Sequence, residues 1–359
     1  MSEIRVLSVK DDAAEIEKWN EFVAAHSEAT LYHHLAWRRI FEQSFGYKSW
    51  MLMACDEGGG GQTVGVLPLY LVNGLFSSKL VSVPFRDRGG PLWITGDALE
   101  ALLTSAKLLI KEAGAKLLVM KSLSRWPVDT LRNHTLLENM HWVRSVVPIN
   151  SLSVETLWKN IGAKTRNMIR QAEANGLAFE DITNSPDALD QWYRLHLGTQ
   201  KRLGIPPFPK VYFLSLIREL MMIGAVSVYC VKKENLALAA MILFRDGRTG
   251  IYAYSASSVD AQKLRANDLL IFRTIRELIS AGYWNFDMGS DSPHQDSLLF
   301  FKRKWGAKQL AIPHYSYGSF DPASADSASS RYKLARRFFS WLPLPLSALF
   351  SRYGTRYFG

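Results

Sequence analysis

An internal repeat constrains this sequence more than any single motif does. Each half of the chain has predicted helices, then a strand hairpin with a cysteine near the end of its first strand, and then another strand. Each half closes with a long predicted helix that ends in Ala-Gly and with a final strand. Cys55 precedes Gly114 at about the distance at which Cys230 precedes Gly282. Two copies of one supersecondary unit predict two similar domains.

The elements of this repeat follow from hydrophobic spacing and from helix-ending residues. The Gly58–Gly61 run predicts a hairpin loop, Gly176 predicts a helix end, and Ser185 with Pro186 predicts a helix start with serine as the N-cap. Apolar residues at helical spacing predict helices over residues 11–25, 34–44, 98–113, 153–176, 185–204, 210–224 and 267–282. Strand-forming runs occupy residues 50–57, 63–72, 78–85, 116–123, 225–234, 236–247, 250–257 and 284–289.

This element order is that of a GNAT acetyltransferase. We therefore expect an α/β (α+β) fold of tandem duplicated GNAT-like domains, each a mixed, mostly antiparallel sheet flanked by helices. The expected boundaries are 1–150 for the N-terminal domain and 151–320 for the C-terminal domain, which should hold the active site. Residues 321–330 are small and polar and predict a linker, and a tail follows at 331–359. The alternative is two generic α+β domains whose order agrees by chance.

Charge and cysteine usage limit the partners. The formal net charge of +10 favours an anionic partner, which can be a nucleic acid, a nucleotide-linked substrate or an anionic membrane face. Two cysteines form neither a disulfide framework nor a zinc site. The charged N-terminus has no apolar signal region, and no run of 18 apolar residues occurs, so we expect a cytoplasmic protein. The basic, aromatic tail suits an anionic inner-membrane surface, or else it packs on the body of the protein.

The densest polar cluster spans residues 286–307. Asp287 ends a predicted strand, where an α/β sheet usually opens its cleft. Lys302 lies among Phe300, Phe301 and Trp305, which predicts a partly buried ammonium that needs an anionic partner. Each residue alone is more often structural, a cap or a surface lysine, but the combination favours a site.

Two further polar sets are weaker. Lys164, Arg166 and Arg170 lie in one predicted helix, where a shared face can clamp a phosphate or simply be solvated. Asp291, His294 and Asp296 match no known metal spacing, so no metal is expected. The sequence contains neither a P-loop nor a Gly-x-Ser-x-Gly elbow, and it lacks the motifs of sequence-specific DNA readers.

Coenzyme A enzymes of the GNAT fold hold the pyrophosphate on an Arg/Gln-x-x-Gly-x-Gly/Ala loop at a helix start. The corresponding stretch here is Arg265-Ala266-Asn267-Asp268, which keeps an arginine but has no glycine. Arg265 and Asn267 are the cofactor-binding candidates, although side chains should crowd the amides. The first domain has even less at that point, so we expect it to support the second or to bind the acceptor.

The sequence resembles the FemAB-like branch of the GNAT superfamily, in particular the FemAB-related proteins associated with exosortase/PEP-CTERM and exopolysaccharide systems. The resemblance covers roughly residues 15–318. It rests on segments 29–47, 63–72, 80–92, 164–177, 203–213, 252–257 and on FDMGSDSP…FFKRKWGA at 286–307.

The resemblance implies two GNAT-like domains and transfer of amino acids from aminoacyl-tRNA to a peptidoglycan precursor. It also implies a Phe-Lys pair near the end of the second domain, which Phe301-Lys302 fits. Lys302 would then stabilise the oxyanion or meet the tRNA end, and Arg166 or Arg170 would meet the acceptor's phosphates. The sequence lacks the helical tRNA arm of the peptidoglycan enzymes.

The leading hypothesis is an acyl- or aminoacyl-transferase acting on an amine or hydroxyl of an anionic cell-envelope or exopolysaccharide precursor. Asp287 would accept a proton or orient the amine, and Lys302 would stabilise the oxyanion. Tyr254 and Ser255 would line the cleft, and Phe301 and Trp305 would contact substrate. The donor would be acyl-CoA or aminoacyl-tRNA, with no tightly bound cofactor. The alternatives are an acetyl-CoA-dependent N-acetyltransferase and a non-catalytic module of a membrane-associated biosynthetic complex.

Overall fold

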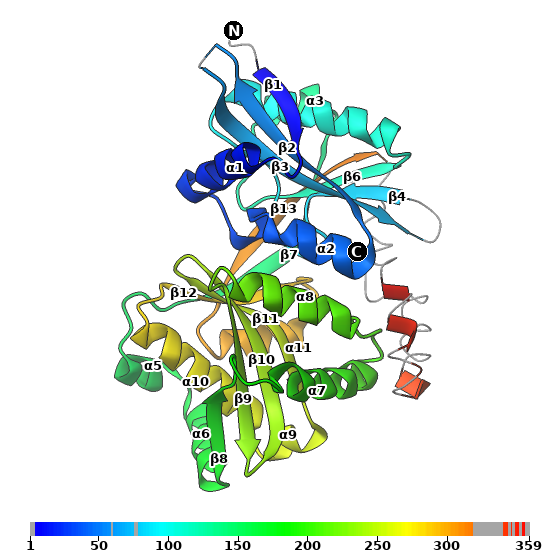
Figure 1. Cartoon of the computed structure of the whole chain (residues 1–359). Coiled ribbons are helices and arrows are strands. Elements are labelled where there is room, and N and C mark those ends of the chain that lie inside the picture. Colours follow the sequence, from blue (N-terminus) through cyan, green and yellow to red (C-terminus); the bar gives the residue numbers. More distant parts are fainter. Residues whose placement is uncertain are drawn as a thin grey trace. The chain divides into compact units, whose positions relative to one another are not determined.

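The computed structural model describes residues 4–318 except 59 and 75–77, together with 340–343, 346, 349–351, 354 and 355. The chain forms two compact units (Figure 1). The first unit contains the chain up to His141 and the segment that begins at Ala311. The second unit contains Trp142–Leu310 and part of the C-terminal tail. None of the described helices is long and apolar enough to cross a bilayer.

The first unit is a mixed sheet with strand order β1-β2-β3-β4-β6-β13, in which only β4 and β6 run parallel. Short β5 pairs with β3. Helix α3 packs its apolar face on this sheet and builds a core with Trp126 and Tyr315. The elements are β1 (Ile4–Val9), α1 (Ala13–Ala25), the 3-10 helix η1 (Leu31–His33), α2 (Ala36–Phe45), β2 (Lys48–Asp56), β3 (Gln62–Asn73), β4 (Ser78–Val81), β5 (Leu92–Trp93), α3 (Gly96–Glu112), β6 (Leu117–Lys121), α4 (Val128–Asn133) and β13 (Lys308–Gly318).

The second unit has strand order β7-β12-β11-β10-β9-β8, in which only β11 and β12 run parallel. Helices α5, α6 and α10 contribute to the core on one face of this sheet, whereas α7 contacts β10 and β11 from the other face. The elements are β7 (Leu137–Pro148), α5 (Val154–Asn160), α6 (Ala163–Ala174), β8 (Leu177–Asp181), α7 (Ala188–Leu203), α8 (Lys210–Met221), β9 (Val226–Lys233), β10 (Leu236–Asp246), β11 (Thr249–Ser257), α9 (Val259–Lys263), α10 (Ala266–Ser280), β12 (Asn285–Asp291) and α11 (Asp296–Arg303).

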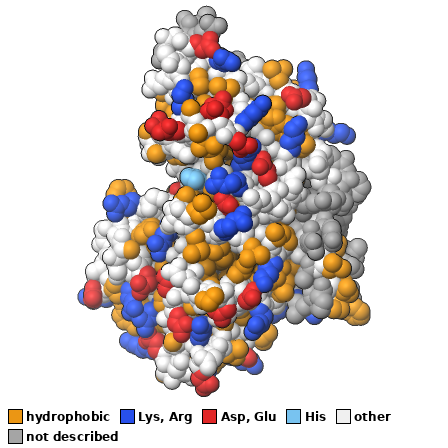
Figure 2. All heavy atoms as spheres, in the orientation of Figure 1, with side chains coloured by type: hydrophobic (Ala, Val, Ile, Leu, Met, Phe, Trp, Pro, Cys, Tyr) orange, Lys and Arg blue, Asp and Glu red, His pale blue; other side chains and the backbone are white. Residues whose placement is uncertain are grey.

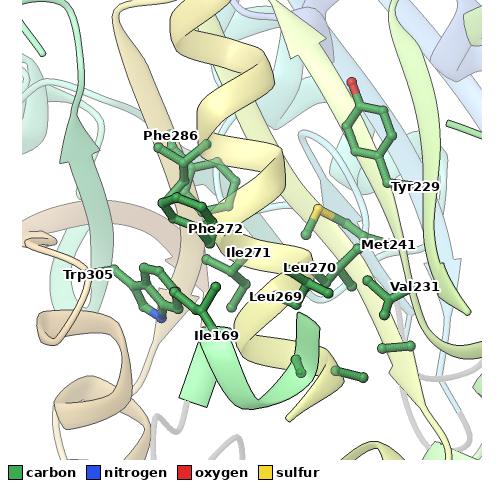
Figure 3. Close-up of a cluster of buried hydrophobic side chains, with 14 of the residues drawn as sticks. Ile169, Tyr229, Val231, Met241, Leu269, Leu270, Ile271, Phe272, Phe286 and Trp305 are labelled. Atoms are coloured by element: carbon green, nitrogen blue, oxygen red, sulfur yellow. The ribbon is translucent and has the colours of Figure 1, made fainter. Parts of the chain in front are cut away.

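Helix α10 is the centre of the second core. Its four consecutive residues Leu269, Leu270, Ile271 and Phe272 are all buried, which marks a helix covered on every side. Figure 3 shows these side chains between Ile169 of α6 and the strand residues Tyr229, Val231 and Met241. Burial of this kind stabilises each large side chain by roughly 1.5–3 kcal/mol. The core therefore fixes the start of α10, where the candidate site begins.

The fold prediction is confirmed, and most predicted elements are present. The predicted start of the helix over residues 185–204 was wrong, because Asp187 rather than Ser185 is the N-cap of α7. The Ser185 hydroxyl instead donates to the Asp187 carboxylate at 2.7 Å, which holds the Ser-Pro-Asp segment as a turn before the helix. The C-caps follow expectation, since Gly176 and Gly204 both have positive φ after their helices.

Each compact unit contains one strand segment that comes from the other half of the sequence. Residues 311–318 of β13 belong to the first unit, where they pair antiparallel with β6. Residues 142–148 of β7 pair with β12 in the second unit. The expected boundaries of 1–150 and 151–320 stay a prediction. The expected linker at 321–330 and most of the tail lie outside the described residues.

Candidate functional site

The parallel strands of the second unit separate soon after they meet. Strand β11 pairs with β12 over only three positions, and the last pair joins Ile251 to Asp287. Strand β11 then continues to Ser257 and β12 to Asp291 without further pairing between them. Ligands of α/β sheets bind beyond the carboxyl ends of parallel strands. The separation therefore marks the place where this unit can admit a substrate.

A β-bulge lies at the beginning of this opening. Ile242 of β10 pairs with Tyr254, but the next residue, Leu243, pairs with Tyr252, so Ala253 is the extra residue. Residues two apart normally share a face of a strand. Here Tyr252 packs on the core of α10, whereas the Tyr254 ring lies in the aromatic cluster of α7 and α8. The bulge thus leaves backbone groups outside the ladder, as bulges next to active sites do.

A cavity of about 390 Å³ lies between the end of β11, the α9–α10 turn and α11. Both cofactor-binding candidates, Arg265 and Asn267, line it. Three basic side chains reach it, those of Arg202, Arg265 and Lys304, and Lys304 is paired at 2.5 Å with Asp268. Its lining is otherwise small, polar or apolar, and includes Ser257, Ser258, Met168 and Phe301. A cavity of this chemistry suits an anionic group attached to an apolar chain.

At the turn into α10, Arg265 adopts a backbone conformation that glycine usually takes. Arg265 has φ +61°, a left-handed conformation that few non-glycine residues adopt. The amides of the first turn of α10 follow directly, and a helix start favours an anion. Crowding of these amides by side chains stays a prediction, whereas the backbone of Arg265 has the left-handed conformation typical of glycine.

Lys302 is buried at the end of β12. Its side chain is only 6% exposed and forms an ion pair with Asp291, whose side chain is 9% exposed. The Nζ of Lys302 also donates to the Gly289 carbonyl at 3.1 Å. Burial raises the pKa of Asp291, and the ammonium of Lys302 opposes that shift. An ammonium has three donors, so this geometry leaves one for a substrate.

Asp287 and Lys302 both contact the backbone of Gly289. Asp287 is fully buried, and one carboxylate oxygen accepts from Arg144 Nε at 2.7 Å. Its other oxygen accepts from the Gly289 amide at 2.8 Å. Asp287 and Lys302 thus fix the two sides of Gly289, which has φ +78°. Sequence reasoning placed these two residues together but missed Arg144, because the strand β7 that carries it was not predicted.

The basic set of α6 is not brought into this centre. Lys164 and Arg170 are exposed, and the Arg170 guanidinium lies 5.4 Å from the centre of the Trp158 ring. Arg166 donates to three carbonyls at the end of α5, the closest being that of Ile161 at 2.5 Å. It therefore caps the preceding helix. A role for these residues in phosphate binding stays a prediction.

The remaining candidates divide between cavity and core. Phe301 lines the cavity, whereas Trp305 is 3% exposed and belongs to the hydrophobic core. The Tyr254 hydroxyl hydrogen-bonds to the Tyr212 hydroxyl at 2.8 Å, and Ser255 hydrogen-bonds to Tyr252. Within the part of the chain that the structure describes, no group of three or more His, Cys, Asp or Glu side chains can hold a metal ion.

Comparison with known families identifies this region. Residues 160–296 match the acetyltransferase (GNAT) domain. The match contains the separating strands, the bulge and most of the residues that line the cavity of the second unit, whereas Phe301 and Lys304 of that lining follow it. No curated protein matches the chain by sequence.

Solved structures show that the likeness extends over both units. FemX aligns with a TM-score of 0.68 at 16% identity, covering 89% of this chain and 99% of that one. The C-terminal domain of a candidate lysylphosphatidylglycerol synthetase from Agrobacterium fabrum aligns at 0.58 and 16%, covering 87% and 95%. A tandem GNAT protein from the clavulanic acid biosynthesis pathway aligns at 0.57 and 11%, covering 89% and 100%. At identities this low, the alignments show a shared fold alone.

Proposed function

We propose that this protein transfers an acyl or aminoacyl group to an amine or hydroxyl of a cell-envelope or exopolysaccharide precursor. The observation that carries the proposal is the separation of β11 from β12 beside a cavity lined by three basic side chains. FemX and the lysylphosphatidylglycerol synthetase domain share this fold, and the name of the second points to a membrane lipid, which is a component of the cell envelope. The donor is acyl-CoA or aminoacyl-tRNA, whose phosphates Arg202, Arg265 and Lys304 can meet.

The transfer needs no covalent enzyme intermediate. The acceptor nitrogen or oxygen attacks the donor carbonyl, and a new C–N or C–O bond forms. The bond from that carbonyl to the donor's sulfur or ribose oxygen then breaks. The proton leaves the acceptor and ends on the departing group. Lys302 uses its third N–H to stabilise the oxyanion, and the backbone freed by the bulge at Ala253 orients the carbonyl.

Asp287 serves as a positioning residue in this scheme. Both of its oxygens already accept hydrogen bonds, from Arg144 and from the Gly289 amide. Accepting a substrate proton would require it to break a fully buried ion pair. Its contribution is therefore to hold the backbone of Gly289, whose carbonyl Lys302 contacts.

An acetyl-CoA-dependent N-acetyltransferase is the second candidate. It is favoured by the left-handed Arg265, because the turn keeps the chain path that a glycine loop would give. The two candidates differ in the donor that the cavity binds and agree on the reaction type.

A membrane role for the tail, with cytoplasmic location, completes the proposal. Among the few tail residues that the structure describes, Trp341 is 88% exposed and Leu349 is 55% exposed. Exposed aromatic and aliphatic side chains within a basic segment suit an anionic membrane surface. Loss of membrane association on deleting residues 331–359 would support this part of the proposal.

The donor is tested by binding and thermal-shift measurements with acetyl-CoA, longer acyl-CoAs, and charged and uncharged tRNA. Asn267→Asp adds a carboxylate at the cavity with almost no change of shape. We expect it to weaken donor binding roughly tenfold, the scale of one charge-assisted contact. Asn235→Asp, at an exposed turn outside this cavity, is the matched control.

Each outcome decides between donors. Stabilisation by coenzyme A thioesters alone selects the ordinary acyltransferase, and preference for charged tRNA selects aminoacyl transfer. Binding of no donor, or equal weakening by the two asparagine variants, would contradict the assignment of the cavity.

A further inference from the structure

Helix α8 of the second unit is apolar on two opposite faces. Its inner face is fully buried and includes Tyr212, Phe213 and Leu216. The apolar side chains of its outer face are instead 40% to 74% exposed, and they are Val211, Leu214, Met221 and Met222. A helix at the surface of a soluble domain normally carries polar side chains on its outer face. The outer face of α8 therefore marks a surface that contacts something other than water.

The exposed side chains of this face are neighbours along the helix. Residues three and four apart lie above one another on an α-helix, and Val211, Leu214 and Arg218 follow this spacing. Met221 and Met222 continue it at the end of the helix. Figure 2 shows hydrophobic side chains gathered over the part of the second unit where Figure 1 places α8. The outer face is thus one continuous apolar strip.

The charges of α8 are arranged so that a cation, and no exposed carboxylate, accompanies this strip. Within α8, every residue of which the structure describes, the one acid is Glu219, and its side chain is only 5% exposed. Its partner Arg218 lies 3.1 Å away with a side chain that is 59% exposed. Lys210, at the start of the helix, pairs with Asp190 of α7. Apolar side chains accompanied by basic ones suit a surface of anionic lipid.

The described part of the C-terminal tail is held close to the start of α8. Ser351 is buried, and its side chain hydrogen-bonds to Tyr193 of α7. The Tyr193 hydroxyl also donates to the Phe208 carbonyl at 3.1 Å, and the Phe208 ring stacks on Tyr212 of α8. Leu349, two residues before Ser351, is 55% exposed. Exposed apolar side chains of the tail and of α8 therefore belong to the same part of the second unit.

We propose that the outer face of α8 is a docking surface for a membrane rich in anionic phospholipid. The inference rests on the proposed function in one respect, namely that the tail meets the same membrane. One weak anchor gives only marginal and reversible membrane binding, whereas two that act together hold a protein at the surface. The outer face of α8 supplies the second anchor.

The size of the strip favours lipid over a second copy of the chain. A helix of 12 residues is about 18 Å long and about 10 Å wide, so its outer face covers roughly 200 Å². A stable interface between proteins buries about 800 Å² on each partner. The strip alone is too small for a stable dimer, but it is large enough to act as one of two membrane anchors.

Cosedimentation of the full chain with phosphatidylglycerol–phosphatidylcholine vesicles tests this surface without any transfer reaction. We expect Leu214→Glu to weaken binding to these vesicles roughly tenfold, because a carboxylate would have to enter the apolar layer beside anionic headgroups. Leu108→Glu is the matched control, since Leu108 is an exposed leucine of helix α3 in the first unit. It should bind like the unchanged protein. Both leucines are more than half exposed, so the two variants are expected to fold.

A second readout locates the contact on the helix. The two cysteines of the chain, Cys55 and Cys230, are both buried. Met222→Cys and Leu108→Cys therefore each add one accessible thiol for a polarity-sensitive dye. The emission from position 222 should shift to shorter wavelength when the anionic vesicles are added, and brominated lipid should quench it. The emission from position 108 should not change.

The results separate α8 from the tail, because Leu214→Glu leaves residues 331–359 intact. Weaker vesicle binding by Leu214→Glu, with unchanged binding by Leu108→Glu, supports the docking surface. Equal binding by Leu214→Glu and the unchanged protein would overturn it, even where deletion of residues 331–359 abolishes binding and the role of the tail stands. A dye at position 222 that does not respond in vesicle-bound protein would overturn it as well. Sedimentation equilibrium that shows a dimer, lost in Leu214→Glu, would identify a second copy as the occupant and would also overturn it.

Discussion

The second unit continues both parallel strands beyond their last pair, whereas the first unit stops β4 at Val81 and places a loop across the end of β6. Lys121 and Gly289 lie at matching positions, each two residues beyond the last paired residue of its strand. In the first unit the cation is the ammonium of Lys121, which stands at this position. In the second unit it comes from Lys302 of α11, which reaches the Gly289 carbonyl.

This difference shows that the two units end their parallel strand pairs in different ways. The first unit closes the strand ends with a packed loop and surrounds them with basic side chains. The second keeps its strands apart and pairs its lysine with Asp291. The opening in the second unit suits a reaction.

The largest expected effect comes from Lys302→Met. It leaves Asp291 buried without its partner, which should lower the free energy of unfolding by about 3–5 kcal/mol. Transfer should fall about 10²-fold or more through loss of oxyanion stabilisation. Denaturant unfolding and transfer kinetics measure the two effects.

Lys302→Met combined with Asp291→Leu separates those effects. The double variant replaces the buried pair by apolar side chains, so stability should largely return while transfer stays low. Recovery of full transfer in the double variant would show that Lys302 is only structural.

Glycine substitutions compare how tightly the two strand pairs are packed. A Cβ at Gly90 would lie 2.6 Å from a backbone oxygen of Lys121, whereas one at Gly250 of β11 would lie 2.5 Å from a terminal carbon of Leu278. A side-chain end can move and a backbone strand cannot, so Gly90→Ala should cost about 2–3 kcal/mol and Gly250→Ala about 1 kcal/mol. Equal midpoints in urea unfolding would contradict this order.

The last effect is a pH dependence specific to the first unit. The folded pKa of Lys121 is about 7 and its ordinary value is 10.5, so between these values the unfolded chain binds more protons. Stability should therefore rise with pH from 7 to 10.5, by at most ~1.4 kcal/mol per pH unit for one proton. The difference between the unchanged protein and Lys121→Met isolates this slope, and parallel pH profiles would show that Lys121 titrates normally.

The sequence predicted the tandem fold because helices and strands with regular hydrophobic spacing recur in the same order in both halves. Strands β1, β5, β7, β8 and β13 were missed. Three of them, β1, β7 and β13, mix polar and apolar residues and form strands because of neighbours far along the chain. The candidate site was predicted only in part, because some of its residues lie on elements that the sequence did not predict. Lys302 and Asp287 stood out in one segment, whereas their partner Arg144 lies on a missed strand, and the capping role of Arg166 depends on where α5 ends.

The strand exchange described for β13 has a consequence for how the protein is made. During synthesis, β6 emerges early but its antiparallel partner, which pairs His314 with Lys121, emerges only after the whole second unit. Until then the first unit has an unpaired strand edge, which is a site for misassociation with other chains. Expression of residues 1–150 alone should therefore give a protein that aggregates unless the segment 308–318 is supplied. Strand β13 completes the sheet of the first unit, so a nascent chain gains this pairing only after the second unit has been synthesised.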